Sequence, residues 1–548
     1  MKRKLKVIAA VLLVLIMFIS AMPMQLAAEA MTPLTTRYAT PDGYNDHDYQ
    51  KMVAFFEQTD ENGVRNGEKL SEDYDPTDPE TWREYDGDHC RGDITWTTVA
   101  GEYRLCDIFF GGIGNDALPL ELVGFLDVSG CTALTEVRCW SSGDIQLTGL
   151  DVSECVALAE LYCAGNELTE LDVSGCAALE VLHCSHNEIM ELDVSNCTAL
   201  TRLDCDGNEL TELDVSECAA LENLDCSGNQ LTELDVSANA ALENLDCSEN
   251  QLTELDVSVN TGLRILYCSD NQLTELDVSA NTGLRTLYCS DNQLTELDVS
   301  TNAELVWLGC SRNQLTELDV SANAALEELD CSDNQLTELD VSANTGLSYL
   351  YCSDNQLTEL DVSTNAELYE LDCSWNQLTE LDVSVNTELG SLDCSGNQLT
   401  ELDLSNNPQI DIDTISAEGS GFIGVGTEWD ENYDKWYCIK AVPVPGNSFC
   451  GWYAVDGTLL STNVEINRND FDGVNDFVAK FTASTPGGIG DVDGDGVVRV
   501  SDAVLIMRCA LGLIEFTPEQ ILCGDVDDDG VIKIADAVMV IRIALGLV

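Results

Sequence analysis

Positive charge is scarce in this chain of 548 residues. It carries 24 Lys and Arg against 99 Asp and Glu, which gives a formal net charge of -75. Nucleic acids and anionic membranes are bound by cationic protein surfaces, so neither is expected as a partner. The imbalance does not indicate disorder, because 45% of the residues are apolar and such a chain can build folded cores.

Long apolar runs are absent after Ala30, so no later segment is expected to span a bilayer. The segment 1–30 begins with basic side chains, continues with an apolar run and ends at a small-x-small site, Ala28-Glu29-Ala30. This order is typical of a secretory signal peptide cut after Ala30, with a retained membrane anchor as the alternative. We therefore expect residues 1–30 to be removed and the mature protein to be secreted, extracellular or part of a cell-surface complex, without membrane insertion.

Residues 31–125 do not repeat. They combine a helix-like apolar spacing around Met52 and Phe56 with two strand-like segments on either side of Ala100-Gly101. A block of this kind before a repeat array is interpreted as an N-terminal cap, which shields the open end of stacked repeats. Cys90 and Cys106 are a candidate disulfide in it, and the sequence leaves open whether they pair.

From Cys131 to about Asn407 the sequence repeats every 21 residues, as L-x-x-L-x-C-x-x-N-x-L-x-x-L-D-V-S-x-N/C-x-x. The repeated cysteines are Cys163, Cys184, Cys205, Cys226, Cys247, Cys268, Cys289, Cys310, Cys331, Cys352, Cys373 and Cys394. The pattern resembles the leucine-rich repeat, with Cys in the third leucine position. The resemblance implies a parallel-β solenoid over residues 126–410, in which each coil adds one short strand and equivalent positions stack into columns.

Three readings of the cysteine column compete. The thiols are small apolar core residues, neighbouring thiols form disulfides, or the column binds metal. Side chains in register on parallel strands point the same way and the coils do not alternate, so core packing is favoured. A second column holds Cys155, Cys176, Cys197 and Cys218 where later coils hold Asn239 and its successors. These side chains are expected to satisfy backbone groups where the chain bends.

Variation between the copies concentrates at the outward positions around the Cys strand. The late coils place aromatic and scarce arginine side chains there, and both types anchor interfaces, while flat rings also stack on sugars. The candidate ligand face consists of Arg264, Tyr267, Arg285, Tyr288, Trp307, Arg312, Tyr349, Tyr351, Tyr369 and Trp375. The plain alternative is that tyrosine simply favours strands. The expected ligand is an unknown protein or glycan.

Residues 411–483 are rich in strand formers and are expected to form a small all-β domain. The segment A-x-P-x-x-G-x-x-F-x-G-W, from Ala441 to Trp452, resembles small β repeat domains of bacterial surface proteins, including internalin-type ones. Cys438 and Cys450 are a second candidate disulfide, again left open. Residues 484–489 read as a short flexible linker.

The C-terminal segment, 490–548, contains two similar loops that begin at Asp491 and Asp525, each opening with D-x-D-x-D-G and carrying Asp at the twelfth loop position. Three short carboxylates, a glycine at the sharp turn, a carbonyl at position 7 and a final carboxylate are typical of calcium loops. Two Ca²⁺ ions are therefore expected. Their ligands would be Asp491, Asp493, Asp495, Val497 (carbonyl) and Asp502, then Asp525, Asp527, Asp529, Val531 (carbonyl) and Asp536.

The duplication, the Asp at position 12 and the lack of a helix before each loop resemble the dockerin module of cellulosomes. The resemblance implies an α-helical dockerin whose partner is the cohesin module of a scaffold protein. Carried over by position, the cohesin-binding residues are Val500, Ser501, Met507, Arg508, Ile534, Ala535, Ile541 and Arg542. The family often has polar Ser/Thr pairs at positions 10 and 11. Val-Ser and Ile-Ala are more apolar, which leaves the cohesin type and the binding orientation open.

Histidine is rare as well. The four residues are His47, His89, His183 and His186, and no Ser/His/Asp or Cys/His arrangement stands out. Acid pairs recur identically in each coil, unlike a single catalytic pair, and residues 31–125 are too few for a glycosidase barrel. The sequence thus predicts a secreted, non-catalytic adaptor in a polysaccharide-degrading complex. The alternatives are a dockerin-bearing hydrolase, with its activity in residues 31–125, or a secreted enzyme inhibitor.

Overall fold

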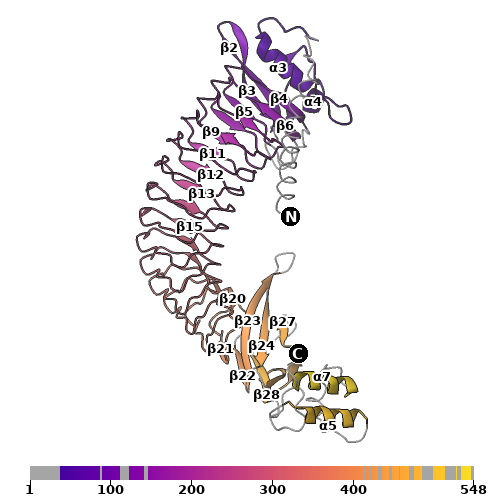
Figure 1. The fold of residues 1–548 in the computed structure, drawn as a ribbon, viewed down its shortest axis with the longest axis vertical. Coiled ribbons are helices and arrows are strands. Elements are labelled where there is room, and N and C mark those ends of the chain that lie inside the picture. Colours follow the sequence, from indigo (N-terminus) through magenta and orange to yellow (C-terminus); the bar gives the residue numbers. More distant parts are fainter. Residues whose placement is uncertain are drawn as a thin grey trace, which may run out of the picture. The chain divides into compact units, whose positions relative to one another are not determined.

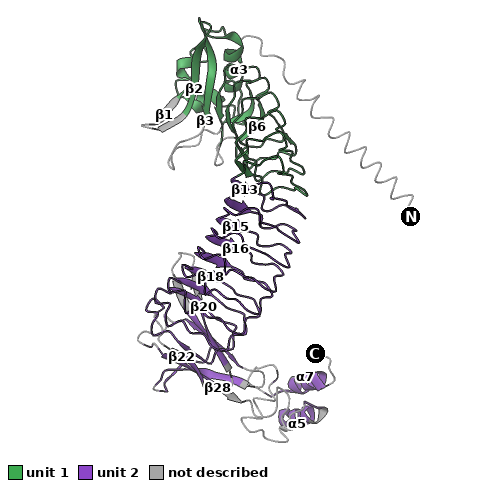
Figure 2. Cartoon of the chain, turned by 90° about the vertical axis from the view of Figure 1, so that its left-hand side faces the viewer, with its two compact units in different colours: residues 1–242 green, residues 243–548 purple. Residues whose placement is uncertain are grey.

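The computed structural model divides into two units, residues 1–242 and 243–548 (Figure 2). It describes residues 38–86, 89–110, 122–140, 146–410, 414–418, 421–429, 435–443, 447–455, 457–467, 474, 476–483, 498–511, 526 and 532–544. The expected signal peptide and the linker at 484–489 lie outside these residues. Within them, no helix combines the length and the apolar character needed to cross a bilayer.

The N-terminal end of unit 1 is a cap built on a helix and a hairpin (Figure 1). Helix α3 (Asp46–Phe56) turns its apolar side chains inward, as its spacing predicts, and Tyr49 stacks on Trp82 with ring centroids 5.2 Å apart. The short helices α4 (Asn66–Leu70) and η1 (Pro79–Thr81) and strand β1 (Glu84–Asp86) complete it. Strands β2 (His89–Val99) and β3 (Glu102–Phe110) form the predicted hairpin around Ala100 and Gly101, both at positive φ.

The cap is continuous with the first coil, because β3 pairs in parallel with β5 (Glu136–Arg138). The hairpin register also excludes one candidate disulfide. Cys106 lies opposite the Thr95/Trp96 bulge, five residues along β2 from Cys90, or about 17 Å at strand spacing. A disulfide needs Cα atoms within about 7 Å, and the Cys106 thiol is reduced. The side chain of Cys90 lies outside the described residues.

Both units contain 21-residue coils in which three-residue parallel strands pair in register, as the repeat predicts. In unit 1 these are β7 (Glu160–Tyr162), β9 (Val181–His183), β11 (Arg202–Asp204) and β12 (Asn223–Asp225). In unit 2 they are β13 (Asn244–Asp246), β14 (Ile265–Tyr267), β15 (Thr286–Tyr288), β16 (Trp307–Gly309), β17 (Glu328–Asp330), β18 (Tyr349–Tyr351), β19 (Glu370–Asp372) and β20 (Ser391–Asp393). Unit 1 adds β4 (Val123–Asp127) with β6 (Gln146–Asp151), and β8 (Leu171–Asp172) with β10 (Leu192–Asp193).

The core of the coils is a stack of leucine, valine and cysteine columns. Every repeated cysteine from Cys163 to Cys394 is fully buried, and these thiols are reduced. The structure therefore favours the core-packing reading over disulfides, and none of these cysteines belongs to a metal-capable cluster among the described residues. A buried cysteine behaves here as a small apolar side chain.

Burial changes the acid–base behaviour of these thiols. It raises the pKa of Cys289 from its ordinary value of about 9 to about 12, and it raises those of Cys268 and Cys310 as well. Because the pKa of each thiol is higher in the folded state than in the unfolded state, the protonated thiol favours folding. This contribution to the free energy of unfolding is complete below the unfolded pKa of about 9 and is lost as the pH rises towards 12. Each thiol then costs about 1.4 kcal/mol per pH unit above the unfolded pKa.

We expect the urea midpoint of the coils to stay level up to about pH 8.5 and to fall steeply above pH 9. The measurement is circular dichroism at 218 nm against urea at several pH values under reducing conditions. In the double variant Cys268→Ala/Cys289→Ala, the free energy of unfolding should fall less steeply with pH above pH 9, and the difference in slope should correspond to about two protons. An unchanged midpoint at about pH 10.5 would show that the column does not control alkaline stability.

Two asparagine columns hold the bends of the coils. Asn292 donates from Nδ2 to the carbonyls of Cys268, Cys289 and Ser290 at 3.0, 3.2 and 3.1 Å, and its Oδ1 accepts from the amide of Leu273 at 2.9 Å. In the second column, Asn302 donates to the carbonyls of Val278 and Asn281. Where that column holds cysteine, as at Cys197, the thiol donates to one carbonyl at 3.6 Å. The predicted exchange of Cys and Asn is thus structural.

The all-β segment of unit 2 contains two sheets. One has the order β21-β22-β28-β25-β26 and the other β23-β24-β27. The strands are β21 (Glu401–Asp403), β22 (Thr414–Glu418), β23 (Gly421–Trp429), β24 (Lys435–Pro443), β25 (Asn447–Tyr453), β26 (Leu459–Ser461), β27 (Glu465–Asn467) and β28 (Asp476–Ala483). Cys438 and Cys450 lie in different sheets, and both thiols are reduced.

These sheets continue directly from the last coil. The amide of Cys394 donates to the carbonyl of Val425 at 2.8 Å, and that of Ile423 donates to Leu399 at 2.9 Å. Gly424 makes this approach possible, because a Cβ there would lie 2.7 Å from the Cα of Ser395. The all-β segment therefore closes the end of the apolar core that the last coil would expose, which repeat arrays require.

At the end of unit 2, two helices of equal length pack together: α5 (Val500–Ala510) and α7 (Ile534–Ala544). Their shared core consists of Ala503, Ile506, Ala537 and Val540, all essentially buried. Ala503 and Ala537 occupy equivalent positions of the sequence duplication, and so do Ile506 and Val540. The duplication therefore builds a small helical domain with equivalent halves.

Candidate functional site

Each helix of the C-terminal pair begins around a fully buried carboxylate. Asp502 Oδ2 accepts the amide of Arg499 at 2.8 Å, and Asp536 Oδ2 accepts the amide of Lys533 at 2.7 Å. The other oxygen of Asp536 accepts the amide of Val526 at 3.0 Å. This last bond joins the second position of the second loop to its twelfth, so that loop closes onto its final carboxylate.

These observations fit a calcium site. Buried carboxylate oxygens at the same place in two equivalent loops are the hard donors that Ca²⁺ takes, and the remaining predicted donors are also oxygens. Bound calcium would supply positive charge that neutralises each acidic loop. The eight other predicted ligands lie outside the described residues: Asp491, Asp493, Asp495, Val497, Asp525, Asp527, Asp529 and Val531.

The predicted partner-binding residues of the helix pair fall into three groups. Arg508, Arg542 and Ile534 are exposed. Met507 and Ile541 are partly buried and pack against the shared core, so much of each side chain supports the helix pair. The side chains of Val500, Ser501 and Ala535 lie outside the described residues.

The structure adds two residues that sequence reasoning missed. Val504 is 50% exposed and Val538 is 49% exposed. In each helix the valine lies four residues after loop position 10 and four residues before an exposed arginine. The residue at loop position 10, the valine and the arginine therefore share one face of the helix. This spacing of four residues was the feature of the sequence that could have identified the two valines. Their equal exposure shows that both helices present a valine at the equivalent position.

All ten residues of the candidate ligand face lie in unit 2, on or beside strands β14–β19. Trp307, Tyr349, Tyr369 and Trp375 are exposed, by 40%, 37%, 43% and 63%. Tyr267, Tyr288 and Tyr351 are half-buried. The rings of Tyr267 and Tyr288 lie 5.4 Å apart and those of Tyr349 and Tyr369 lie 6.2 Å apart, so the structure brings the tyrosines together in two pairs.

Glycines in the next coil let several rings lie along the surface. A Cβ at Gly309 would be 2.4 Å from the ring of Tyr288, and one at Gly390 would be 2.9 Å from the ring of Tyr369. Tyr288 therefore lies across Gly309, and its hydroxyl reaches Glu328 Oε1 at 3.4 Å. The rings are held by backbone packing and present flat surfaces.

Arg264 and Arg312 of the face are engaged with acidic neighbours. Arg264 approaches Glu243 at 3.5 Å, and Arg312 lies between Asp291 at 3.3 Å and Asp333 at 3.7 Å. Arg285 is exposed. Exposed pairs of this kind contribute little stability, so their main effect is to set the local charge.

Arg312 and Trp375 occupy a turn position that favours glycine. Their φ values are both 51°, and the equivalent residues of other coils include Gly207, Gly228 and Gly396. A bulky side chain in the left-handed region is strained by about 1 kcal/mol or more. Despite this cost, an arginine and a tryptophan occupy this position at the edge of the ligand face, where glycine would offer no side chain.

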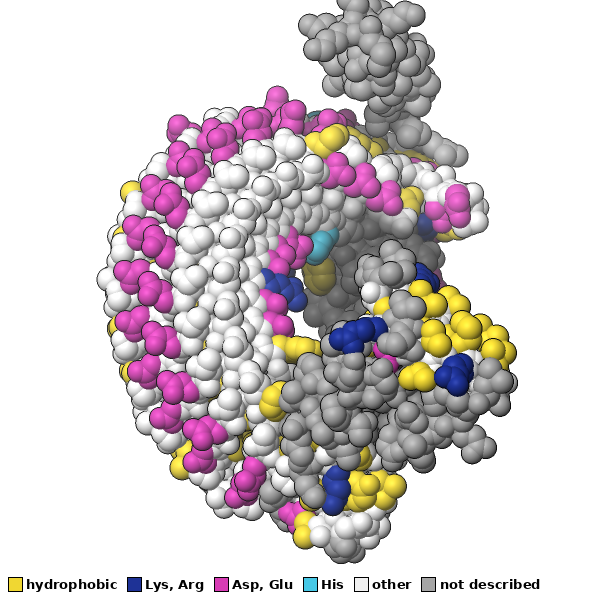
Figure 3. Space-filling model, turned by 60° about the horizontal axis from the view of Figure 1, so that its bottom comes forward, with side chains coloured by type: hydrophobic (Ala, Val, Ile, Leu, Met, Phe, Trp, Pro, Cys, Tyr) yellow, Lys and Arg dark blue, Asp and Glu magenta, His cyan; other side chains and the backbone are white. Residues whose placement is uncertain are grey.

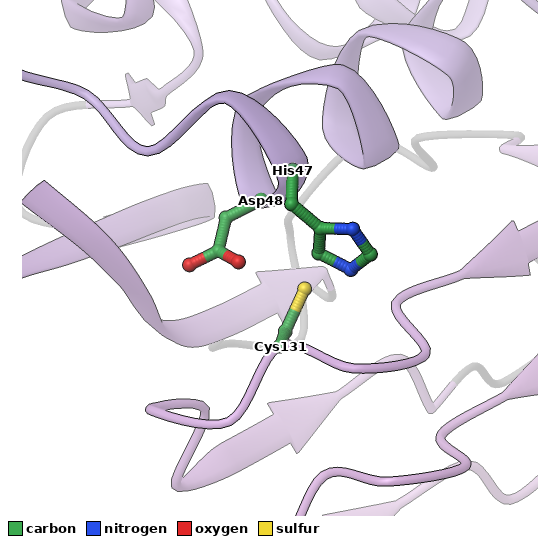
Figure 4. A group of neighbouring side chains, drawn as sticks. All are labelled: His47, Asp48 and Cys131. Carbon is green, nitrogen blue, oxygen red and sulfur yellow. The ribbon is translucent and has the colours of Figure 1, made fainter.

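A separate cluster in unit 1 joins His47, Asp48 and Cys131 (Figure 4), whose potential ligand atoms lie within 4.8 Å of one another. Asp48 is already used, because it accepts from Arg104 at 2.6 and 3.1 Å and from the amide of Leu105 at 3.0 Å. His47 Nε2 donates to the carbonyl of Ser129 at 2.7 Å. Burial, with the charge of Asp48, raises the pKa of the Cys131 thiol. The cluster fits a structural joint in unit 1 better than a metal centre.

Rows of acidic side chains repeat from coil to coil (Figure 3). In the repeated TELD segments, Asp298 Oδ1 accepts the amide of Ser300 at 2.9 Å. The side-chain hydrogen bond from Ser300, followed by this backbone bond, lowers the pKa of Asp298. Asp277 and Asp319 make the equivalent bonds. These aspartates cap turns on an exposed surface.

Comparisons with known proteins agree with this description. The model of the dockerin type I domain matches residues 489–545, and a model of two leucine-rich repeats matches residues 261–302 and 324–367. No curated protein sequence matches the chain.

Solved structures with coils of this kind are similar as well. The functional domain of InlJ from Listeria monocytogenes, which includes a cysteine ladder, is 29% identical with a TM-score of 0.51, covering 68% of this chain and 93% of that one. The internalin InlF of the same species is 24% identical with a TM-score of 0.42, covering 53% and 85%. YopM from Yersinia enterocolitica is 27% identical with a TM-score of 0.41, covering 54% and 70%. The chain is a leucine-rich-repeat protein with a type I dockerin domain at residues 489–545.

Proposed function

We propose that the protein is a non-catalytic adaptor that docks through its dockerin onto a cohesin-bearing scaffold and holds a partner on its repeats. The observation that carries this proposal is the pair of equivalent helices, each with a buried aspartate in its first turn and an exposed valine and arginine on one face. Arginine is enriched among the residues that anchor interfaces, and burial of the neighbouring valine against a partner would add an apolar contribution.

Calcium would couple loop order to docking. Asp502 and Asp536, with the predicted oxygen donors of each loop, would hold one ion per loop, two in all. Each carboxylate also accepts an amide at the start of its helix, so the loop and the first helical turn are fixed together. Metal binding is then part of the folding free energy of the domain.

The extracellular complex in which the protein works and the ligand of its repeats are also part of the proposal. Dockerin domains belong to cellulosome-like complexes that degrade polysaccharides, which supports a secreted protein working outside the cell or at its surface. The exposed rings and the arginines of unit 2 support a protein or a glycan as the ligand of the repeats. Assaying the whole chain on plant polysaccharides tests the adaptor role, since turnover would instead indicate a dockerin-bearing hydrolase. Capture of an active protease or glycosidase with loss of its activity would indicate an inhibitor.

Substitutions on the two helix faces test the docking. Because Val504 and Val538 are equally exposed, we propose that the domain docks in two equivalent orientations, each using one helix face. We therefore expect Val504→Asp or Val538→Asp alone to weaken binding to a cohesin module by less than about threefold, and the double variant by more than about a hundredfold. Calorimetry with purified type I cohesin modules gives the affinities. As a matched control, Val259→Asp and Val385→Asp, both 43% exposed on the coils, should have no effect. A single helix face that accounts for all the binding would refute two equivalent orientations, and no binding to any cohesin would refute the docking itself.

A further inference from the structure

Aromatic and acidic strands alternate from β16 to β19 in unit 2. Strand β17 presents Glu328 and Asp330, β18 presents Tyr349 and Tyr351, and β19 presents Glu370 and Asp372. In the parallel register, each tyrosine of β18 lies between a carboxylate of β17 and one of β19. Trp307 on β16 precedes Glu328 in the same column. These seven residues are called the alternating face.

The carboxylates of the alternating face are held by neutral groups. The amide of Ser332 donates to Asp330 at 3.0 Å and that of Ser374 donates to Asp372 at 2.9 Å. Hydroxyl groups of Tyr288 and Ser391 lie 3.4 Å from Glu328 and Glu370. These bonds orient the carboxylates without neutralising them.

The surrounding coils supply almost no compensating charge. Residues 307–375 are all described by the structure, and Arg312 is the only basic side chain among them; it is engaged with Asp291 and Asp333. Burial, with the charges of Asp330 and Glu370, raises the pKa of Glu328, although the bond from Tyr288 opposes this. The face therefore concentrates negative charge around exposed rings.

This combination favours one class of occupant. The π-face of a tyrosine attracts a cation. A Lys or Arg side chain over a tyrosine of β18 would gain this attraction and would also pair with the carboxylates of β17 and β19 on either side. An acidic polymer would be repelled, and an uncharged glycan would stack on the rings but leave the carboxylates uncompensated. We propose that the alternating face binds a basic polypeptide segment, whose Lys or Arg side chains lie over Tyr349 and Tyr351 and pair with the carboxylates of β17 and β19. The inference rests on the proposed role of the repeats in holding a partner.

The test measures binding of octalysine, octaglutamate and cellohexaose to the full-length chain with calcium present. Octalysine should bind, and more weakly at high ionic strength. Glu328→Gln/Glu370→Gln should weaken it about tenfold, and Tyr349→Ala/Tyr351→Ala by a similar factor. The matched control Glu338→Gln/Glu359→Gln removes the same charge from exposed residues of two TELD segments and should change binding by less than about twofold.

Two results would overturn the inference. An equal loss in the control variant would mean that octalysine responds only to net charge. Binding of cellohexaose that is lost in Tyr349→Ala/Tyr351→Ala but kept in Glu328→Gln/Glu370→Gln would identify a glycan surface. The glutamine variants are nearly isosteric, so they keep the test valid if the alanine variant misfolds. Cohesin binding measured in the same variants separates the two proposals, because it should be unchanged whatever happens at the alternating face.

Discussion

Removing calcium should lower the affinity of the chain for a cohesin module by at least about a hundredfold. Each loop ends in a fully buried aspartate that also accepts an amide at the start of the following helix. Without the ion, the clustered carboxylates of a loop repel one another, and the buried aspartate loses the positive charge that the ion would supply. Order is then lost in the first turns of α5 and α7, which position the exposed valines and arginines.

The experiment combines chelation with substitution. Calorimetry against a cohesin module is run with calcium, with excess chelator and after calcium is restored, and far-ultraviolet circular dichroism follows the helices. Asp502→Asn/Asp536→Asn should reproduce the chelated state even with calcium present. Asp340→Asn/Asp361→Asn, with the same charge change in two TELD turns, should bind normally. Calcium-independent binding by the Asp502→Asn/Asp536→Asn variant would contradict the proposed coupling.

The sequence predicts the repeating parts of this protein well, because a constant repeat period determines which positions share a column. The burial of Cys163 to Cys394 follows directly from that period, since an equivalent position in each coil meets the same neighbours. The resemblance to dockerins similarly predicted a helix after each loop, and Arg508 and Arg542, which it implies as cohesin contacts, are exposed.

Contacts between segments of different pattern were not predictable in this way. Nothing in the sequence near Gly424 signals that β23 lies against Ser395 of the last coil. The partial burial of Met507 and Ile541 likewise depends on the angle at which two helices meet. The spacing of Cys90 and Cys106 depends on a hairpin register set by its turn. The alternation of β17, β18 and β19 was readable in the sequence, but only the paired strands show that each tyrosine lies between carboxylates.

Replacing Asn292 by alanine should destabilise its coil more than replacing the more deeply buried Asn302. Asn292 makes four hydrogen bonds, and its loss leaves three carbonyls and the amide of Leu273 without this partner. Asn302 makes two, and its Oδ1 is buried without a partner. At roughly 1 kcal/mol per bond, Asn292→Ala should cost about 4 kcal/mol and Asn302→Ala about 2 kcal/mol.

Hydrogen exchange is the suitable measurement, because a coil in a repeat array opens locally and a single global free energy does not describe it. The free energies of opening that are measured at the amides of residues 268–310 should fall by these amounts. Asn302→Cys provides the control, since the same column holds Cys197 with one bond to a carbonyl, and it should cost only about 1 kcal/mol. If Asn302→Ala proved the more damaging substitution, burial and not the number of hydrogen bonds would determine how these columns stabilise the coils.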